Sequence, residues 1–248
     1  MSTQPSAQLS LFEARDTSQT WTVRVSRRAR RLSVRVYPGG KVEVVVPPGA
    51  SPAIVQRFVG THRAWIDERV SDLSIAPPLA NQLRPSEIYL PSIDRRYRVE
   101  YHHSPDPLAV HVVEPDSRLI VHGPLQDDRQ IANVLRRWLT QLAHRELGER
   151  LAHVAKEGGF NYERVQIRRQ RTRWGSCSAT GTISLNLCLV FLSPAVVRYL
   201  LVHELCHTRH MNHSARYWAL VERHEPDYER LDKELVRGWQ SVPGWVFG

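Results

Sequence analysis

The segment from Ser193 to His207 constrains the fold more than any other part of the chain. Ser193 followed by Pro194 is a strong helix start, because Ser caps the first turn and Pro is tolerated at the first helical position. The helix that follows carries His203 and His207, which a four-residue spacing places one turn apart on the same face. The apolar residues around them fall on the opposite face, so the sequence predicts a helix that packs on a core and presents two imidazoles.

The five residues His203-Glu204-Leu205-Cys206-His207 have the form H-E-x-x-H, in which both imidazoles can reach one metal ion. Glu204 is offset by about 100° from His203, close enough to hold a water molecule on the ion without binding the ion itself. Zinc is the default for this donor set. The ion would polarise the carbonyl under attack, while Glu204 takes the proton of the attacking water and passes it to the leaving amine.

A catalytic zinc needs a third protein ligand, and the residues alone leave its identity open. His213 stands six residues after His207, which is the third-ligand spacing of a longer metallopeptidase pattern, although the Gly of that pattern is replaced by His210. His210 shares the helical face, but a straight helix places its Cα about 10 Å along the axis from that of His203. Glu222 or Glu225 from the next helix would give a His, His, Glu set instead, and the order of preference is His213, then Glu222, then His210.

The order of the predicted elements, strands first and helices later, indicates the α+β class. Three short strands are predicted at 21–25, 32–36 and 42–46, followed by one helix from Ser51 to about Leu73. A longer helix is predicted to begin at residues 127–128, where two Asp suit the helix dipole, and to run to about Lys156, where Gly158 and Gly159 stop it. The apolar side of that helix is expected to comprise Ile54, Phe58, Trp65 and Val70. The predicted domains are a tail (1–19), an antiparallel β-rich region with one helix (20–125) and a catalytic domain (126–248).

The chain has the features of a cytoplasmic protein without a membrane anchor. Its first 19 residues lack the apolar stretch of a secretory signal, and its longest apolar run, 187–192, is too short to span a bilayer. The three cysteines form no C-x-x-C pair, which indicates reduced thiols.

A set of spaced motifs runs through most of the chain. They are 171–178 (RTRWGSCS), 183–186 (ISLN), 203–207 (HELCH), 212–214 (NHS) and 217–218 (YW), with 27–31 and 62–66 nearer the N-terminus. In this order they resemble the YgjP-like metallopeptidase family, relatives of the SprT-type zinc proteases. The resemblance implies a zincin-like catalytic domain that cleaves peptides, with His203, His207 and His213 as zinc ligands and Glu204 as the catalytic residue. Tyr217 stands where the family more often has Phe, so no role is expected for its hydroxyl.

The segment after Arg173 precedes a strand that could form the edge of a substrate cleft. An extended peptide could add to such an edge as a further strand. The candidate cleft residues are Trp174, Gly175, Ser176, Cys177 and Asn186. The alternative is that Trp174 anchors the core and Gly175 makes a turn.

A formal charge of +9 and a pI near 9.9 favour an anionic partner. Arginines crowd the ranges 24–35 and 168–173, a density that suits DNA phosphates but is also typical of a solvated face. In the N-terminal tail, Gln8, Leu9, Leu11 and Phe12 resemble the peptide by which bacterial replication and repair proteins dock on the sliding clamp. This second resemblance implies action at DNA, where SprT-type relatives digest crosslinked proteins.

The sequence therefore predicts a zinc-dependent peptidase that acts on DNA-associated proteins. One alternative is a metal-dependent hydrolase of nucleotide phosphoanhydrides, which would use the same activated water and the arginines near the site. The other is a non-catalytic clamp or DNA adaptor.

Overall fold

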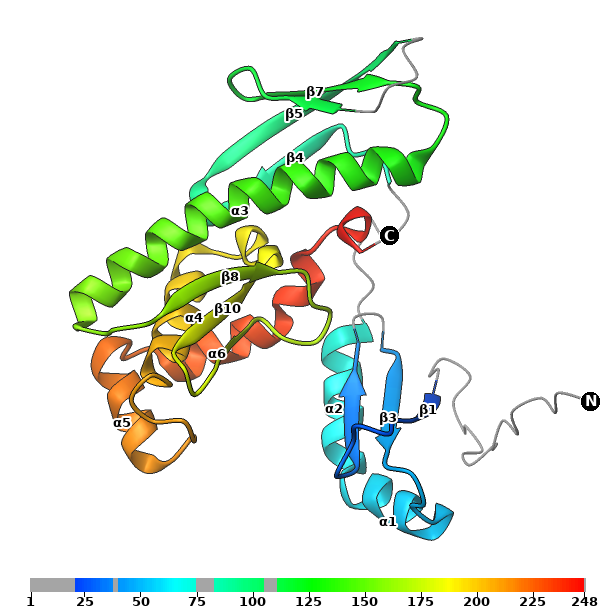
Figure 1. The fold of residues 1–248 in the computed structure, drawn as a ribbon, viewed down its shortest axis with the longest axis vertical. Coiled ribbons are helices and arrows are strands. Elements are labelled where there is room, and N and C mark those ends of the chain that lie inside the picture. Colours follow the sequence, from blue (N-terminus) through cyan, green and yellow to red (C-terminus); the bar gives the residue numbers. More distant parts are fainter. Residues whose placement is uncertain (1–20, 38–39, 75–82, 105–110, 248) are drawn as a thin grey trace, which may run out of the picture. The chain divides into compact units, whose positions relative to one another are not determined.

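The computed structural model describes residues 21–37, 40–74, 83–104 and 111–247 (Figure 1). Contacts divide the chain into two compact units, Met1–Ala76 and Pro77–Gly248. Strands precede most of the helices, and the predicted α+β class is confirmed. Among the helices of the described ranges, none has both the length and the apolar character needed to cross a membrane.

The first unit contains a three-stranded sheet built from β1 (Trp21–Val25), β2 (Ser33–Val36) and β3 (Val42–Val46). The strand order is β1-β3-β2, with β1 parallel and β2 antiparallel to the central strand. Four valines of β3 are at most 4% exposed, as expected for a central strand. The three strands lie where the sequence predicts them, and the sheet that they form is mixed.

Two helices, α1 (Pro52–Thr61) and α2 (Arg63–Ser74), replace the single helix that the sequence predicts over 51–73. Ser51 caps α1 as predicted, but the helix ends at His62, whose backbone has φ −102° and ψ 8°. The predicted apolar side is also wrong in part, because Ile54 and Trp65 are 54% and 48% exposed. The buried side chains are those of Val55, Val59, Ile66 and Val70. Residues 54 and 58 have the same four-residue spacing as 55 and 59, so periodicity alone does not decide between them.

The second unit begins with a four-stranded sheet of order β4-β5-β7-β6. Its strands are β4 (Glu87–Leu90), β5 (Arg95–His103), β6 (His111–Val113) and β7 (Arg118–Gly123). The long helix α3 (Asp128–Gly158) packs beside it (Figure 1). The ring centroids of Tyr97 and Trp138 are 5.0 Å apart, and the Trp138 Nε1 donates to Glu114 at 2.7 Å. The predicted domain boundary at 125–126 falls between this sheet and α3, whereas the boundary between the compact units lies at residues 76–77.

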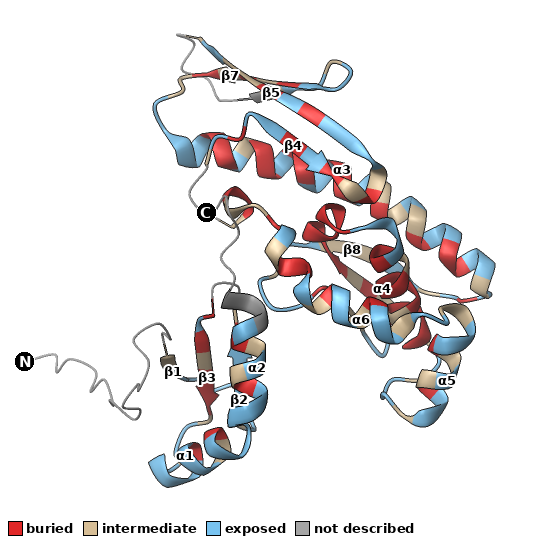
Figure 2. Ribbon diagram, turned by 180° about the vertical axis from the view of Figure 1, so that it is seen from behind, coloured by how far each residue is buried: buried red, intermediate tan, exposed pale blue. Residues whose placement is uncertain are grey.

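Helix α3 begins and ends with the signals that predict it. The side chain of Asp127 accepts a hydrogen bond from the Arg129 backbone N–H, and Gly159 closes the helix with a φ of 62°. Along the helix, buried and exposed residues alternate, with one side turned to the core (Figure 2).

A second sheet, of order β8-β10-β9, supports the C-terminal helices. Its strands are β8 (Arg164–Arg168), β9 (Gly175–Cys177) and β10 (Thr182–Asn186). The helices that follow are α4 (Pro194–Cys206), α5 (Ala215–His224) and α6 (Tyr228–Arg237). Short 3-10 segments are η1 (Pro91–Ile93), η2 (Leu187–Phe191), η3 (Gly238–Ser241) and η4 (Gly244–Val246). Helix α4 contacts α3, α5, α6 and the edge strand β9.

Candidate metal centre and active site

Helix α4 has the start and the apolar face that the sequence predicts. The Ser193 side chain accepts a hydrogen bond from the Val196 backbone N–H, and Pro194 occupies the first turn. Leu201, Val202 and Leu205 are at most 1% exposed. The helix ends at Cys206, and the chain then turns through 207–214 before α5 begins. This early end lets residues beyond the helix approach its last turn.

Three histidines converge at the end of α4. One ligand nitrogen from each of His203, His207 and His213 lies within 4.8 Å of the other two, and this is the one such group of three in the described ranges. The Nε2 atoms of His203 and His213 are 3.3 Å apart. Two ligands of a tetrahedral zinc with Zn–N of about 2.0–2.1 Å would be separated by roughly 3.3–3.4 Å. The histidines therefore fit a tetrahedral metal ion, and neither His210 nor Glu222 belongs to the group.

The ring of His207 is oriented by a backbone carbonyl. Its Nδ1 lies 3.1 Å from the backbone oxygen of His210. A carbonyl oxygen can only accept, so Nδ1 carries the proton and Nε2 keeps its lone pair. His210 thus contributes to the site through its backbone.

The ring of His203 is oriented by a chain of two residues. Its Nδ1 lies 3.4 Å from the hydroxyl of Tyr199, which itself donates to Asp232 Oδ1 at 2.8 Å. Because that proton is committed to the carboxylate, the Tyr199 oxygen accepts from Nδ1, and Nε2 of His203 again keeps its lone pair. Burial, followed by the charges of His207 and His213, lowers the pKa of His203 to about 3. The imidazole is therefore neutral near pH 7, as a metal ligand must be.

Replacing Tyr199 with Phe is expected to weaken the binding of zinc, the ion that the sequence predicts, by roughly 10–100-fold, because the ring of His203 loses the group that orients it. Asp232→Asn should have a smaller effect in the same direction. The measurement is the zinc dissociation constant, obtained by competition with a chromogenic chelator. Asp227→Asn is the control, since this α6-proximal carboxylate pairs with Arg230 instead. Equal zinc affinity in Tyr199→Phe and the wild type would contradict the orienting role.

Tyr217 is a site residue that sequence reasoning missed. It is fully buried, its ring stacks on that of His207 at 4.6 Å, and its hydroxyl donates to the His203 backbone oxygen at 3.0 Å. The expectation that its hydroxyl has no role is therefore wrong, because the hydroxyl ties α5 to the last turn of α4. Tyr217 lies on α5, four residues after the proposed ligand His213, and this short spacing is the sequence signal that could have placed it at the site.

Glu204 follows His203 on α4 and is only 3% exposed. Burial raises the pKa of its carboxyl to about 8, an effect that the charge of Arg173 partly offsets. Within the described part of the chain, its Oε2 atom has no hydrogen-bond partner. A buried carboxylate oxygen without a partner is costly, and such groups are concentrated at functional sites.

Gly175 allows the close approach of β9 to this carboxylate. A Cβ atom at residue 175 would lie 2.5 Å from Glu204 Oε1 and 2.9 Å from its Cδ. Contacts this short force one of the two groups to move. The glycine of the predicted cleft segment thus gives Glu204 its space, although it was not expected to contact the carboxylate.

Gly175→Ala is expected to slow the peptide cleavage that the sequence predicts by roughly 10²-fold, because the added methyl group displaces the Glu204 carboxylate. Zinc content should be unchanged, since the histidines are not touched. Turnover and bound zinc would be measured on the same preparations. Gly148→Ala, where the nearest atom to the new Cβ is 4.0 Å away, is the control and should retain full activity. Wild-type turnover in Gly175→Ala would contradict this account.

The remaining cleft candidates differ in their surroundings. Trp174 is 8% exposed and stacks on Trp239 at 3.9 Å, so its indole packs in the interior. Asn186 is 1% exposed, and its amide donates to the backbone oxygens of residues 170 and 173. It thereby holds the loop that leads to β9. Ser176 and Cys177 are half-buried on β9 itself, opposite Ser184 and Ile183 of β10.

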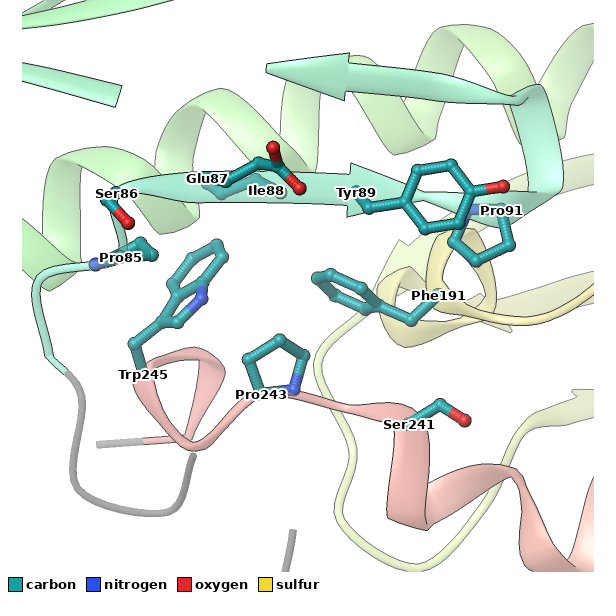
Figure 3. A pocket seen from close by; sticks show the side chains of 10 residues that line it. All are labelled: Pro85, Ser86, Glu87, Ile88, Tyr89, Pro91, Phe191, Ser241, Pro243 and Trp245. Atoms are coloured by element: carbon teal, nitrogen blue, oxygen red, sulfur yellow. The ribbon is translucent and has the colours of Figure 1, made fainter. Parts of the chain in front are cut away.

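Of two cavities in the second unit, one adjoins the site and the other is separate from it. One, of about 320 Å³, adjoins His207 and is lined mainly by the turns 161–163 and 178–181. The other, of about 500 Å³, lies between β4 and the C-terminal segment, where Phe191, Pro243 and Trp245 face the strand (Figure 3). This apolar pocket shares no residue with the histidine group.

The clamp-like residues Gln8, Leu9, Leu11 and Phe12 lie outside the described residues.

Comparison with known proteins identifies the family. Two solved structures resemble parts of the chain, both crystal structures of metallopeptidase zymogens. Abylysin from Pyrococcus abyssi is 25% identical, with 36% of this chain and 90% of that chain covered and a TM-score of 0.34. Jannalysin from Methanocaldococcus jannaschii is 16% identical, with 37% and 95% covered and a TM-score of 0.34. No curated protein matches the chain.

The assignment rests on a family model, described as the YgjP-like metallopeptidase domain, that matches residues 30–237. The match includes both compact units in large part and contains the whole histidine group. Members of such a family are hydrolases that depend on a metal ion. The chain belongs to the YgjP-like metallopeptidase family.

Proposed function

We propose that this metallopeptidase is a zinc enzyme whose ligands are His203, His207 and His213 and whose general base is Glu204. The observation that carries the proposal is the approach of the three imidazoles, with two Nε2 atoms 3.3 Å apart beside a buried carboxylate. Three imidazoles suit zinc better than magnesium or calcium, which prefer oxygen ligands. Zinc in such a site supplies Lewis acidity, which lowers the pKa of water and polarises the carbonyl under attack.

The protein's own groups account for the proton transfers of peptide hydrolysis. Glu204 accepts a proton from the attacking water and delivers it to the leaving amine. Burial makes this carboxylate a stronger base than an exposed one, which suits it to take the proton from water in the first step. Gly175 leaves room for the carboxylate beside β9, and the Tyr217 hydroxyl donates to the backbone oxygen of His203.

The substrate is proposed to bind in extended form along β9. Among the described residues this strand pairs with β10 alone, so its other edge offers backbone groups to a peptide. Gly175 begins the strand and also borders Glu204, which brings a peptide bound there next to the general base. The cavity beside His207 is suited to one side chain of that peptide.

The natural substrates are proposed to be proteins associated with DNA in the cytoplasm. The net charge of +9 and the arginines of 24–35 and 168–173 support a polyanionic partner. The segment Gln8 to Phe12, with its likeness to clamp-binding peptides, supports docking on a sliding clamp. A pull-down of the clamp with the whole chain and with Leu11→Ala/Phe12→Ala tests the docking, and equal recovery by both would refute it.

One experiment distinguishes peptide cleavage from nucleotide hydrolysis. The zinc-loaded protein is incubated with an unfolded polypeptide and, separately, with nucleoside triphosphates. Each reaction is repeated with a chelator and after restoring zinc. Peptide cleavage that the chelator abolishes and zinc restores is the expected result. Phosphate release without peptide cleavage would overturn the proposal in favour of a phosphoanhydride hydrolase.

A further inference from the structure

The third histidine of the proposed zinc site is oriented differently from the other two. The Nδ1 atom of His203 lies 3.4 Å from the Tyr199 hydroxyl. That of His207 lies 3.1 Å from the backbone oxygen of His210. Among the described residues, Nδ1 of His213 has no hydrogen-bond partner, and its Nε2 faces that of His203. His213 is also the exposed member of the group and lies in the segment between α4 and α5, so its ring is held by other contacts.

The ring of His213 stacks on the indole of Trp218. Their ring centroids are 5.5 Å apart, and the two planes meet at 27°. Ser214 is the N-cap of α5, so His213 immediately precedes the cap and Trp218 is the fourth residue of the helix. The Trp218 backbone N–H donates to the Ser214 oxygen at 3.0 Å. A contact between side chains at these two positions is the hydrophobic staple, which fixes the direction from which the chain enters a helix.

The staple matters more at α5 than at the other helices that begin with a serine cap. Ser51 and Ser193 each accept a hydrogen bond from the backbone N–H of the third residue of α1 and α4. The side chain of Ser214 makes no such bond. The start of α5 therefore depends on the stack of His213 and Trp218, and the contact that starts the helix also sets the position of the third histidine.

A second ring supports the indole from α6. The ring centroids of Trp218 and Tyr228 are 5.3 Å apart, with their planes at 24°. Tyr228 is the first residue of α6, and both side chains are half-buried. The rings of His213, Trp218 and Tyr228 therefore connect the third histidine with α6. The same helix supplies Asp232, which orients the ring of His203 through Tyr199.

We propose that Trp218 is a positioning residue of the metal centre, which holds His213 by stacking where the other two histidines are held by hydrogen bonds. This role rests on the proposed zinc site. A bound cation draws electron density from the imidazole, and positively charged groups are attracted to an indole face within about 6 Å. A neutral imidazole without a metal lacks most of this attraction. Trp218 therefore favours the metal-bound form of His213 and raises the affinity for the ion.

The test measures the zinc dissociation constant of the whole chain by competition with a chromogenic chelator. Trp218→Leu is expected to weaken zinc binding about tenfold, at the lower end of the range for groups that orient a ligand. Trp218→Phe keeps an aromatic face and should restore the affinity to within about threefold of the wild type. Trp65→Leu is the matched control, because it makes the same change at an indole of the first unit that is 48% exposed. It should bind zinc as the wild type does.

Two further measurements separate positioning from general stability. In the cobalt-substituted protein, the visible absorption of the ion reports its coordination geometry, and Trp218→Leu should lower its intensity. In the His213→Ala background, Trp218→Leu should cause no further loss of zinc affinity, because Trp218 acts only through His213. If Trp218→Leu does not melt cooperatively, Tyr228→Leu removes the outer ring instead and should weaken zinc binding about threefold, whereas Tyr228→Phe keeps the stack and should not.

Two results would overturn the positioning role. One is wild-type zinc affinity in Trp218→Leu, or in Tyr228→Leu where that variant takes its place. The other is an equal loss of affinity from Trp218→Leu with and without the His213 side chain, which would assign the effect to the fold. Failure of the proposed function is distinguishable. A wild-type chain that binds no zinc would refute the metal centre and the role of Trp218 together, whereas one that binds zinc without cleaving peptides would refute the peptidase alone.

Discussion

Replacing Glu204 with Gln is expected to lower peptidase turnover by roughly 10²–10⁴-fold, the range for loss of a general acid–base group. Gln has the same shape and keeps a polar atom at this position, but it cannot accept a proton from water. Zinc content should therefore stay at the wild-type level while turnover falls. The measurement is the cleavage rate of an unfolded polypeptide at a fixed amount of bound zinc.

The matched control for this variant is Glu222→Gln, which removes a carboxylate from α5 that does not belong to the histidine group. It should cleave the substrate at the wild-type rate. Wild-type turnover in Glu204→Gln would exclude the general base, and an unchanged cellular phenotype would favour the adaptor alternative. A loss of zinc in Glu204→Gln would mean that the carboxylate supports the metal site rather than the proton transfer.

The parts of the fold that the sequence predicts depend on local signals. Ser193 and Pro194 define the start of α4, Asp127 and Gly159 bound α3, and the four-residue spacing brings His203 and His207 to one face. Each of these signals acts within one or two turns of chain. Local capping and periodicity therefore suffice to predict them.

The parts that were missed depend on contacts between distant segments. Tyr199 is on α4, yet its partner Asp232 comes from α6, 33 residues later. Gly175 reaches Glu204 only because β9 packs against α4. In the first unit, packing buries Val55 and leaves Ile54 exposed, and two equivalent periodic patterns cannot reveal which of the two is buried. Tertiary packing determines all three features, so the sequence alone could not predict them.

The identity of the third ligand could be predicted only in part, because it depends on both a local spacing and a tertiary contact. The spacing of His213 permits it to reach the metal only if α4 ends early, and the sequence could express this as a preference over Glu222 and His210. The helix ends at Cys206, and the turn after it directs the His210 backbone oxygen to His207 Nδ1. The same turn returns the chain so that His213 Nε2 meets His203 Nε2. The three histidines therefore converge only because α4 ends at Cys206, and no capping residue in the sequence predicts that end.

His213→Ala is expected to reduce zinc affinity by more than the roughly 10–100-fold typical of residues that only orient a ligand. A catalytic zinc normally has three protein ligands, and this variant leaves only the two imidazoles of α4. Zinc retained after dialysis should fall well below one equivalent, and peptidase activity should fall with it. Circular dichroism would show whether α4 and α5 persist, as expected for a side chain that is exposed and stacks on the neighbouring ring of Trp218.

His210→Ala and Glu222→Gln are the matched controls, because they remove the two competing candidates for the third ligand. His210 uses its backbone oxygen, which alanine retains, so its variant should bind zinc as the wild type does. Loss of zinc in Glu222→Gln with retention in His213→Ala would replace the three-histidine set by a His, His, Glu set. A carboxylate in that place would make the site more negative by one charge, and the match between the imidazole spacing and a tetrahedral ion would then be coincidental.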